Sequence, residues 1–593
     1  MDARPPAEAD LPTWDLADLY AGMDDPVLAA DLDRALVDAQ AFETTHKGRL
    51  VAQSGAEFGG AIETFERIGA VLSKALSYAQ LVQAEDMADS KRGRFAQTVQ
   101  ERVTDISVHT LFFPLEINRL EDAALEAKLA DPQAARYRPW LRDIRVFRPH
   151  QLADDLEKLL HEKEVAGRSA WIRLYDETLA RLRVRLDGKN QTLTQALDRL
   201  SDPDRKKRRA AGRALGKSLS TQLPVLALIT NTLAKDKAIE DDWRHFPHPA
   251  RARNLANRVE DEVVDALVQA VKGAYGPLSH RYYALKAGWL GLPKLAYTDR
   301  NAPLPQDSNR RYGWEEAKAI VEGAYAGFDP EIGRLARRFF DHPWIDAAPR
   351  PGKASGAFAH PTVPSAHPYL LLNYMGKARD VMTLAHEMGH GVHQLLAAKQ
   401  GPLLSETPLT LAETASVFGE MLVFRAMLDS ETDPVHRRVL LAGKVEDMLN
   451  TVVRQVAFHE FERQIHGERR QGELTPTRIA EIWMAVQKES LGPAFRLGAD
   501  YHFFWAYIPH FVHSPFYVYA YAFGDCLVNS LYAVYQKSGA DFLPRYRAML
   551  AAGGTLRHAE LLAPFGLDAS DPGFWRRGLD LVIGFIDDLE RLE

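Results

Sequence analysis

Apolar residues recur at spacings of three and four over two long stretches, 57–130 and 165–240, with charged residues between them. This spacing puts the apolar side chains on one face of a helix, so it predicts a mainly α fold. Pro203 interrupts the second stretch and marks a candidate boundary. We therefore expect an N-terminal helical domain over 1–203 and a second domain over 204–593.

Glycine and proline gather mainly in two segments, 289–306 and 342–368. We expect loops there, with short extended pieces. The candidate strands are Gly356–Ala359 and Tyr369–Tyr374, which together predict a small β element.

Residues 503–523 lack Asp, Glu, Lys and Arg and approach the length of a membrane span. Two prolines interrupt this segment, and its four tyrosines are spread along it rather than placed at its ends. We therefore predict a buried aromatic segment and no membrane association. Ser514 and Pro515 resemble the start of a helix, and Gly539 its end.

The composition excludes several classes of protein. Apolar residues make up 46% and charged residues 26%, which is typical of soluble globular chains and not of disordered ones. Acidic residues (80) outnumber basic ones (73), so nucleic-acid binding is not expected. The lone cysteine, Cys526, fits a reducing compartment. The N-terminal residues do not have the pattern of a secretory signal, so we expect a cytoplasmic protein.

The most informative motif is HExxH at residues 386–390. The apolar spacing around it predicts a helix that Asp380 can cap. On a helix, His386 and His390 point the same way and can share one metal ion. Glu387 is rotated away, so it can act on a metal-bound water without binding the metal. Chance would give such a motif on the order of 0.05 times in this chain.

Two histidines leave the metal one protein ligand short. In metzincins the third ligand is a histidine that would stand at residue 396 here, and this residue is leucine, so that class is excluded. Glutamates of a following helix are the alternative, with Glu406, Glu413 and Glu420 as candidates. Glu406 lies before the helix start. We favour Glu413 as the ligand and Glu420 as a partner of a histidine N–H. Supporting roles for Asp380 and His393 are also expected, because both flank the motif.

Gly389 and Gly391 lie inside the predicted metal-binding helix. Each costs about 1 kcal/mol relative to alanine there. We infer that another part of the chain packs closely against this backbone.

The segments HEMGHGVH and AETASVFGEMLVF resemble the thimet-oligopeptidase family of zinc peptidases, and most of all its oligoendopeptidase F subfamily. The resemblance extends to LPTWDLADLY near the start and to IPHFVHSPFYVYAYAFG near the end. It implies a two-part helical shell around a deep substrate channel in which short peptides are cut. The family pattern also places its third metal ligand where Glu413 stands.

The resemblance assigns roles in the late aromatic segment as well. His510, Tyr517 and Tyr521 correspond to residues that stabilise the oxyanion of the reaction, which needs N–H or O–H donors. His513 is a candidate substrate contact. Either candidate strand, Gly356–Ala359 or Tyr369–Tyr374, is expected to bind the substrate backbone as an added strand, and Gly356, Ala357 and Phe358 are the candidate contacts.

The function expected from these residues is a zinc endopeptidase that carries one Zn²⁺ per chain and acts on short oligopeptides. Two alternatives remain open: a helical zinc carboxypeptidase or dipeptidase, and a peptide-binding scaffold without catalysis. The sequence does not define the oligomeric state.

Overall fold

The structure is a computed structural model that describes residues 11–164, 166–304 and 310–592. Helices make up most of this described part, and the strands in it are seven short pieces. This confirms the predicted mainly α fold. Within the described residues, no helix is both long and apolar enough to cross a bilayer.

The chain divides into two compact units, and each unit combines segments that are far apart in the sequence. Unit 1 comprises Met1–Arg148, Asn309–Ser430 and Val534–Gly566. Unit 2 comprises Pro149–Ser308, Glu431–Ala533 and Leu567–Glu593. This division by packing differs from the boundary expected at Pro203, because the helices that directly precede it pack within unit 2.

Unit 1 holds helices from each of its three segments and one small sheet. Its helices are α1 (Pro26–His46), α2 (Gly55–Glu85), α3 (Ser90–Val108), α4 (Phe112–Arg119), α5 (Asp122–Lys128), α6 (Pro132–Ala135), α7 (Arg138–Arg145), α15 (Trp314–Phe328), α16 (Pro330–Asp341), α17 (Ala378–Ala397), α18 (Leu409–Ser430), α24 (Phe542–Ala551) and α25 (His558–Leu562). Its strands are β4 (Ile345–Asp346), β5 (Phe358–His360) and β6 (Tyr369–Leu371).

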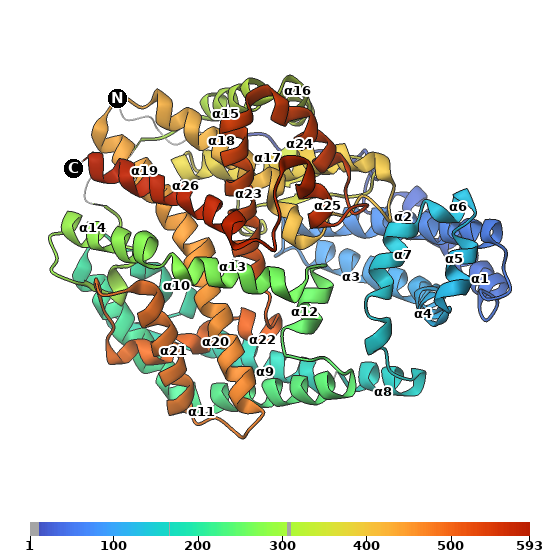
Figure 1. The fold of residues 1–593 in the computed structure, drawn as a ribbon, viewed down its shortest axis with the longest axis horizontal. Coiled ribbons are helices and arrows are strands. Elements are labelled where there is room, and N and C mark those ends of the chain that lie inside the picture. Colours follow the sequence, from blue (N-terminus) through green and yellow to red (C-terminus); the bar gives the residue numbers. More distant parts are fainter. Residues whose placement is uncertain (1–10, 165, 305–309, 593) are drawn as a thin grey trace. The chain divides into compact units, whose positions relative to one another are not determined.

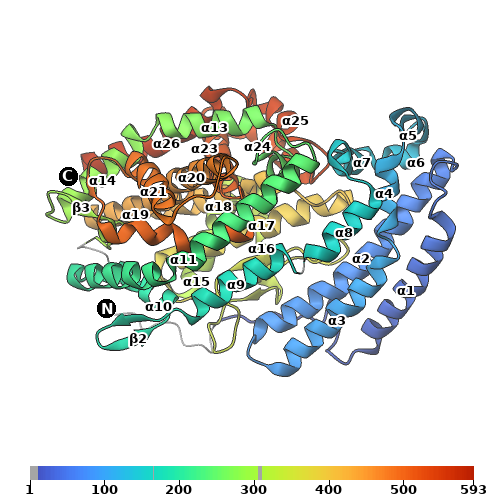
Figure 2. The same ribbon diagram turned by 90° about the horizontal axis from the view of Figure 1, so that it is seen from below.

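Helices α1, α2 and α3 run side by side in unit 1 (Figure 2). A capping box forms at the start of α2: the Ser54 side chain accepts the backbone N–H of Glu57, and the Glu57 side chain accepts the backbone N–H of Ser54. Buried aromatic rings then hold these helices to α4, with the rings of Phe42 and Phe113 5.1 Å apart.

The sheet of unit 1 has the strand order β4-β6-β5, so β5 is an edge strand. Strand β6 is parallel to β4 and antiparallel to β5. The N–H of Leu370 donates to the carbonyl oxygen of Trp344, just before β4, at 2.9 Å, and the N–H of Leu372 donates to that of Asp346 in β4 at 2.8 Å. Because backbone groups alternate along a strand, Tyr369 and Leu371 face β5, where they pair with His360 and Phe358. The backbone of Ala359 therefore points to the open edge.

Unit 2 is built around one long helix. Its helices are α8 (Asp154–Glu164), α9 (Arg168–Arg181), α10 (Leu193–Asp198), α11 (Arg205–Trp243), α12 (Arg251–Ala256), α13 (Asp261–Gly273), α14 (Arg281–Trp289), α19 (Pro434–Met448), α20 (Arg454–Arg469), α21 (Pro476–Leu491), α22 (His510–His513), most of α23 (Tyr519–Ser538) and α26 (Pro572–Arg591). Its strands are β1 (Val184–Leu186), β2 (Lys189–Gln191), β3 (Leu295–Ala296) and β7 (Phe495–Arg496).

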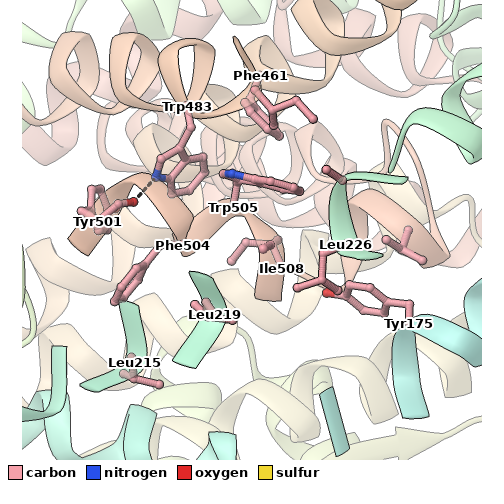
Figure 3. Packing of buried hydrophobic residues seen from close by; sticks show 14 of the residues in the cluster. Tyr175, Leu215, Leu219, Leu226, Phe461, Trp483, Tyr501, Phe504, Trp505 and Ile508 are labelled. Carbon is pink, nitrogen blue, oxygen red and sulfur yellow. Dashed lines mark hydrogen bonds between the residues drawn. The ribbon is translucent and has the colours of Figure 1, made fainter. Parts of the chain in front are cut away.

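The core of unit 2 lies between α11 and the aromatic segment (Figure 3). Leu215, Leu219 and Leu226 of α11 face Phe504 and Trp505, and all five are buried. Each such side chain contributes roughly 1.5–3 kcal/mol through burial. This confirms that residues 503–523 are a buried aromatic segment.

One predicted helix start is wrong. Ser514 and Pro515 do not begin a helix: α22 ends at His513 and α23 begins at Tyr519, and only its end at Ser538 agrees with the prediction. The reason is Phe516, whose φ of 60° lies in the left-handed region and breaks a helical path.

Candidate metal centre

Helix α17 carries the HExxH motif in unit 1 (Figure 1). Asp380 fixes the start of this helix, because its carboxylate accepts the N–H groups of Met375 and Lys377, both at 2.9 Å. Val381, Leu384 and Val392 form part of its buried face. The two histidine rings of the motif lie one turn apart, with centroids separated by 5.0 Å.

Helix α18 packs directly along α17 (Figure 1). A Cβ added at Gly389 would lie 2.3 Å from the carbonyl oxygen of Ala415, and one at Gly391 would lie 2.5 Å from the ring of Phe339. The two glycines therefore permit α18 and α16 to approach the α17 backbone. This confirms the close packing expected from the sequence.

Three side chains from the two helices converge on one point. Oε2 of Glu413 lies 3.3 Å from Nε2 of His386 and 3.5 Å from Nε2 of His390. Within the described part of the chain, these three residues form a group whose donor atoms all lie within 4.8 Å and could hold a metal ion. Glu406 is not part of this metal group.

The electrostatics of the metal group favour a cation. Burial alone would lower the pKa of His386, but hydrogen bonds to Glu413 and Glu420 raise it to about 10. Burial lowers the pKa of His390 to about 4. Although burial works against the charge of Glu413, its hydrogen bond to His386 and the neighbouring positive charge hold its pKa well below the usual range. An ionised Glu413 beside two imidazoles suits a cation, and a metal ion would compete with a proton for His386.

Glu387 lies beside the metal group but outside it. Its side chain is buried, and burial raises its pKa to about 7, while the His386 charge and a hydrogen bond from the Ala359 N–H oppose that rise. The Ala359 contact brings the open edge of β5 next to the Glu387 carboxylate. A carboxyl group with this pKa can both take and give a proton near neutral pH.

The other residues predicted around the motif have defined contacts. Oε2 of Glu420 lies 3.3 Å from Nδ1 of His386, on the side of the ring away from Glu413. His393 is buried, and its Nε2 lies 3.3 Å from Oγ1 of Thr407. The contacts of Asp380 are those at the helix start described above.

The predicted first strand is displaced by two residues. Strand β5 begins at Phe358, so Gly356 and Ala357 precede it. The φ of Gly356 is +83°, a turn conformation that ends an extended path, and its carbonyl accepts a hydrogen bond from Asn373 at 2.9 Å. Of the three residues predicted to bind a peptide backbone, only Phe358 lies in the strand.

The late residues His510, Tyr517 and Tyr521 form a second cluster, in unit 2. Nε2 of His510 lies 3.3 Å from the Tyr521 hydroxyl, and the His510 and Tyr517 rings are stacked at 6.1 Å. The tyrosine rings lie 5.1 Å apart. His513 instead pairs with Asp176 at 2.8 Å.

Glu462 of α20 was not predicted from the sequence. It is fully buried, and its Oε1 accepts the N–H of Phe516 at 2.8 Å. This hydrogen bond holds the left-handed turn that directly precedes Tyr517. No local pattern marks Glu462, because its partner is 54 residues away along the chain.

Comparison with known families gives two matches. The model of peptidase family M3 matches residues 199–581, which include both helices of the metal group. The model described as oligopeptidase F matches residues 116–183.

Curated relatives match over most of their length. The chain is 26% identical over 557 residues to oligopeptidase PepF of Bacillus subtilis (strain 168), covering 92% of this chain and 82% of that protein. It is 25% identical over 592 residues to an oligoendopeptidase F homolog of Lactococcus lactis subsp. lactis (strain IL1403), covering 98% of this chain and 97% of that protein.

Solved structures share the fold. A putative peptidase from Chlamydophila abortus matches with a TM-score of 0.85 and 22% identity over 100% of both chains. The oligoendopeptidase-F from Enterococcus faecium matches with a TM-score of 0.69 and 22% identity, covering 96% of this chain and 99% of that one. With the family match spanning more than half of its length, the chain belongs to peptidase family M3 and is a metalloendopeptidase.

Proposed function

We propose that this chain is a zinc-dependent endopeptidase that cuts internal bonds of short oligopeptides, with Glu387 as its general base. The observation that carries the proposal is the position of Glu413 Oε2, 3.3 and 3.5 Å from the two histidine nitrogens. Atoms bound tetrahedrally to one ion at about 2.1 Å lie about 3.4 Å apart. Two imidazoles and one carboxylate suit one zinc ion per chain and leave a fourth position for water.

When bound, zinc polarises a carbonyl and makes a bound water more acidic. Glu387 takes a proton from the water as the water oxygen forms its bond to the scissile carbonyl carbon. The same carboxyl group then gives this proton to the leaving nitrogen as the C–N bond breaks, which restores the carboxylate.

The open edge of β5 supports binding of an extended peptide. Ala359 is the residue of β5 whose backbone points to that edge, and its N–H reaches Glu387. A substrate that adds here as a strand would be held by main-chain groups, which favours broad sequence selectivity. Gly356, Ala357 and Phe358 remain proposed as neighbours of that peptide.

His510, Tyr517 and Tyr521 are proposed as donors to the oxyanion. The support is the resemblance together with the grouping of the three side chains in unit 2. Burial lowers the pKa of His510, which favours the neutral ring, and a neutral imidazole keeps one N–H to donate. For His513 a substrate contact remains proposed, in competition with its 2.8 Å contact to Asp176.

The cytoplasm remains the proposed location. Its support is Cys526, the lone cysteine, which is buried and free.

The test combines zinc analysis with hydrolysis of quenched fluorescent peptides. Glu387→Gln should lower kcat about 10²–10⁴-fold while the zinc content stays at one per chain. Activity that survives both this substitution and exhaustive chelation would overturn the proposal. Mass spectrometry of the products should show internal cuts. Release of one residue or dipeptide at a time would favour the carboxypeptidase or dipeptidase alternative, and zinc without turnover would favour the scaffold.

A further inference from the structure

A cavity of about 370 Å³ opens directly beside the metal group in unit 1. Three segments form most of its wall: α17 with His390 and His393, the loop 361–368 after β5, and the loop 402–407 before α18. A volume of this size accommodates a large side chain. Because His390 belongs to both the metal group and the cavity wall, a group in the cavity would come from a residue close to the scissile bond.

The loop 361–368 is a rigid wall. Thr362 has a φ of +56°, a conformation that a β-branched residue adopts only at a cost in energy. Its Oγ1 donates to the carbonyl oxygen of His367 at 2.8 Å, which closes the loop on itself. The His367 ring stacks on Trp344 at 3.8 Å, and its Nε2 lies 2.8 Å from a carboxylate oxygen of Asp18. Strain held in place by such contacts is typical of ligand-binding loops.

The wall of the cavity, in the described part of the chain, carries an acidic group and no lysine or arginine. Glu406 is the only carboxylate among the described residues that line the cavity, and none of these lining residues is a lysine or arginine. Glu406 is exposed, and it makes no hydrogen bond or ion pair within the part of the chain that the structure describes. Most of the remaining wall is proline and aliphatic carbon, which suits the methylene stem of a long side chain.

We propose that this cavity is a specificity subsite that receives a lysine or arginine side chain from within two residues of the scissile bond, with Glu406 as its charge partner. The proposal rests on the proposed endopeptidase function. It also gives Glu406, which the sequence offered as a metal ligand, a role in choosing the peptide.

The test is a positional scan with quenched peptides that carry lysine, glutamine or glutamate, one position at a time, on both sides of the cut. At one position the zinc-loaded enzyme should have a kcat/KM about tenfold higher for lysine than for glutamine. Glu406→Gln should reduce that ratio to within about twofold of one, and Glu406→Lys should turn the preference toward glutamate at the same position. The matched control is Glu101→Gln, which removes one exposed carboxylate from α3 of the same unit and should leave the ratio at its wild-type value.

A binding measurement separates affinity from turnover. In the Glu387→Gln background, the Kd of the lysine peptide should rise about tenfold on Glu406→Gln. If the wild-type enzyme cuts peptides but shows no lysine preference, or a preference that Glu406→Gln leaves unchanged, the subsite proposal is wrong and the endopeptidase proposal stands. If the wild-type enzyme cuts no peptide, the endopeptidase proposal itself fails.

Discussion

Glu420 contacts a metal ligand from outside the metal group. Its Oε2 lies 3.3 Å from Nδ1 of His386, which orients the ring and favours a donor electron pair on Nε2. Glu420→Ala should therefore weaken zinc binding about 10–100-fold, measured by competition with a chromogenic chelator. Asp429→Asn, at an exposed position on the same helix, is the control and should leave zinc affinity unchanged. Equal affinity in wild type and Glu420→Ala would contradict this role.

Glu462 should make the stability of the protein depend on pH. Burial raises its pKa to about 8 in the folded chain. The folded state therefore binds the proton more tightly than the unfolded state, so this stabilisation is complete below the usual glutamate pKa and is lost as pH rises through about 8. Glu462→Gln keeps an oxygen for the Phe516 N–H but removes the titration. Its stability relative to wild type should increase between pH 5 and pH 9 by up to about 4 kcal/mol.

The measurement for Glu462 is urea unfolding, followed by tryptophan fluorescence, at several pH values. Glu473→Gln is the matched control, because Glu473 is exposed in the loop after α20, and it should follow the wild-type pH profile. A constant difference between Glu462→Gln and wild type over this pH range would show that the carboxyl group does not titrate there.

The contacts of some site residues could be predicted from the sequence, and those of others could not. The grouping of His386 with His390 follows from helix geometry, which is local. Glu413 was favoured as the third residue because Glu406 lies before the helix start and the family pattern points to Glu413, and it does lie 3.3 Å from His386. The hydrogen bond from Phe516 to Glu462 is different, because its partners are distant in sequence and a left-handed phenylalanine has no sequence signal. Local rules cannot predict such a contact.

Gly389 determines how closely α17 and α18 approach each other. A Cβ at this position would lie 2.3 Å from a backbone oxygen of α18, so the helix rather than a side chain would have to move. Gly389→Ala should lower stability by about 1–3 kcal/mol, despite the better helix propensity of alanine, and should weaken zinc binding by displacing Glu413. Thermal unfolding and zinc titration measure the two effects.

The control for Gly389 is Gly69→Ala in α2, where nothing lies within 4 Å of the added carbon. There only the propensity changes, so stability should rise by up to about 1 kcal/mol. If Gly389→Ala behaved in the same way as Gly69→Ala, the close approach of the two helices would not matter.

Helices and strands were predicted well where local sequence signals were strong. Their predicted ends were displaced where contacts with distant parts of the chain determine the backbone conformation. The helix around HExxH was expected and spans Ala378–Ala397, because its apolar face and the Asp380 cap agree. Strand β5 begins two residues later than expected, since Gly356 adopts a positive φ. The predicted helix start at Ser514–Pro515 was wrong because Glu462 accepts the N–H of Phe516 and stabilises its left-handed conformation, which interrupts the helix.

The two compact units could not be derived from the order of the sequence, because each unit gathers three separated segments. Residues 149–203 read as a continuation of the first helices, yet β1 and α10 pack against α11 in unit 2. Composition and periodicity report which segments are helical and amphipathic. They do not report which of many similar apolar faces meet.

Removal of the metal should act on one unit far more than on the other. The donor atoms all come from α17 and α18, so binding stabilises those helices against opening, by an amount that grows with zinc concentration over its Kd. Chelation should lower the thermal midpoint by several degrees and speed amide hydrogen exchange in 378–430. Exchange in the α11 core, which contributes no metal ligand, should change by less than twofold. Uniform acceleration over both units would show instead that the zinc stabilises the chain as one cooperative body, and zinc re-addition should reverse the local effect.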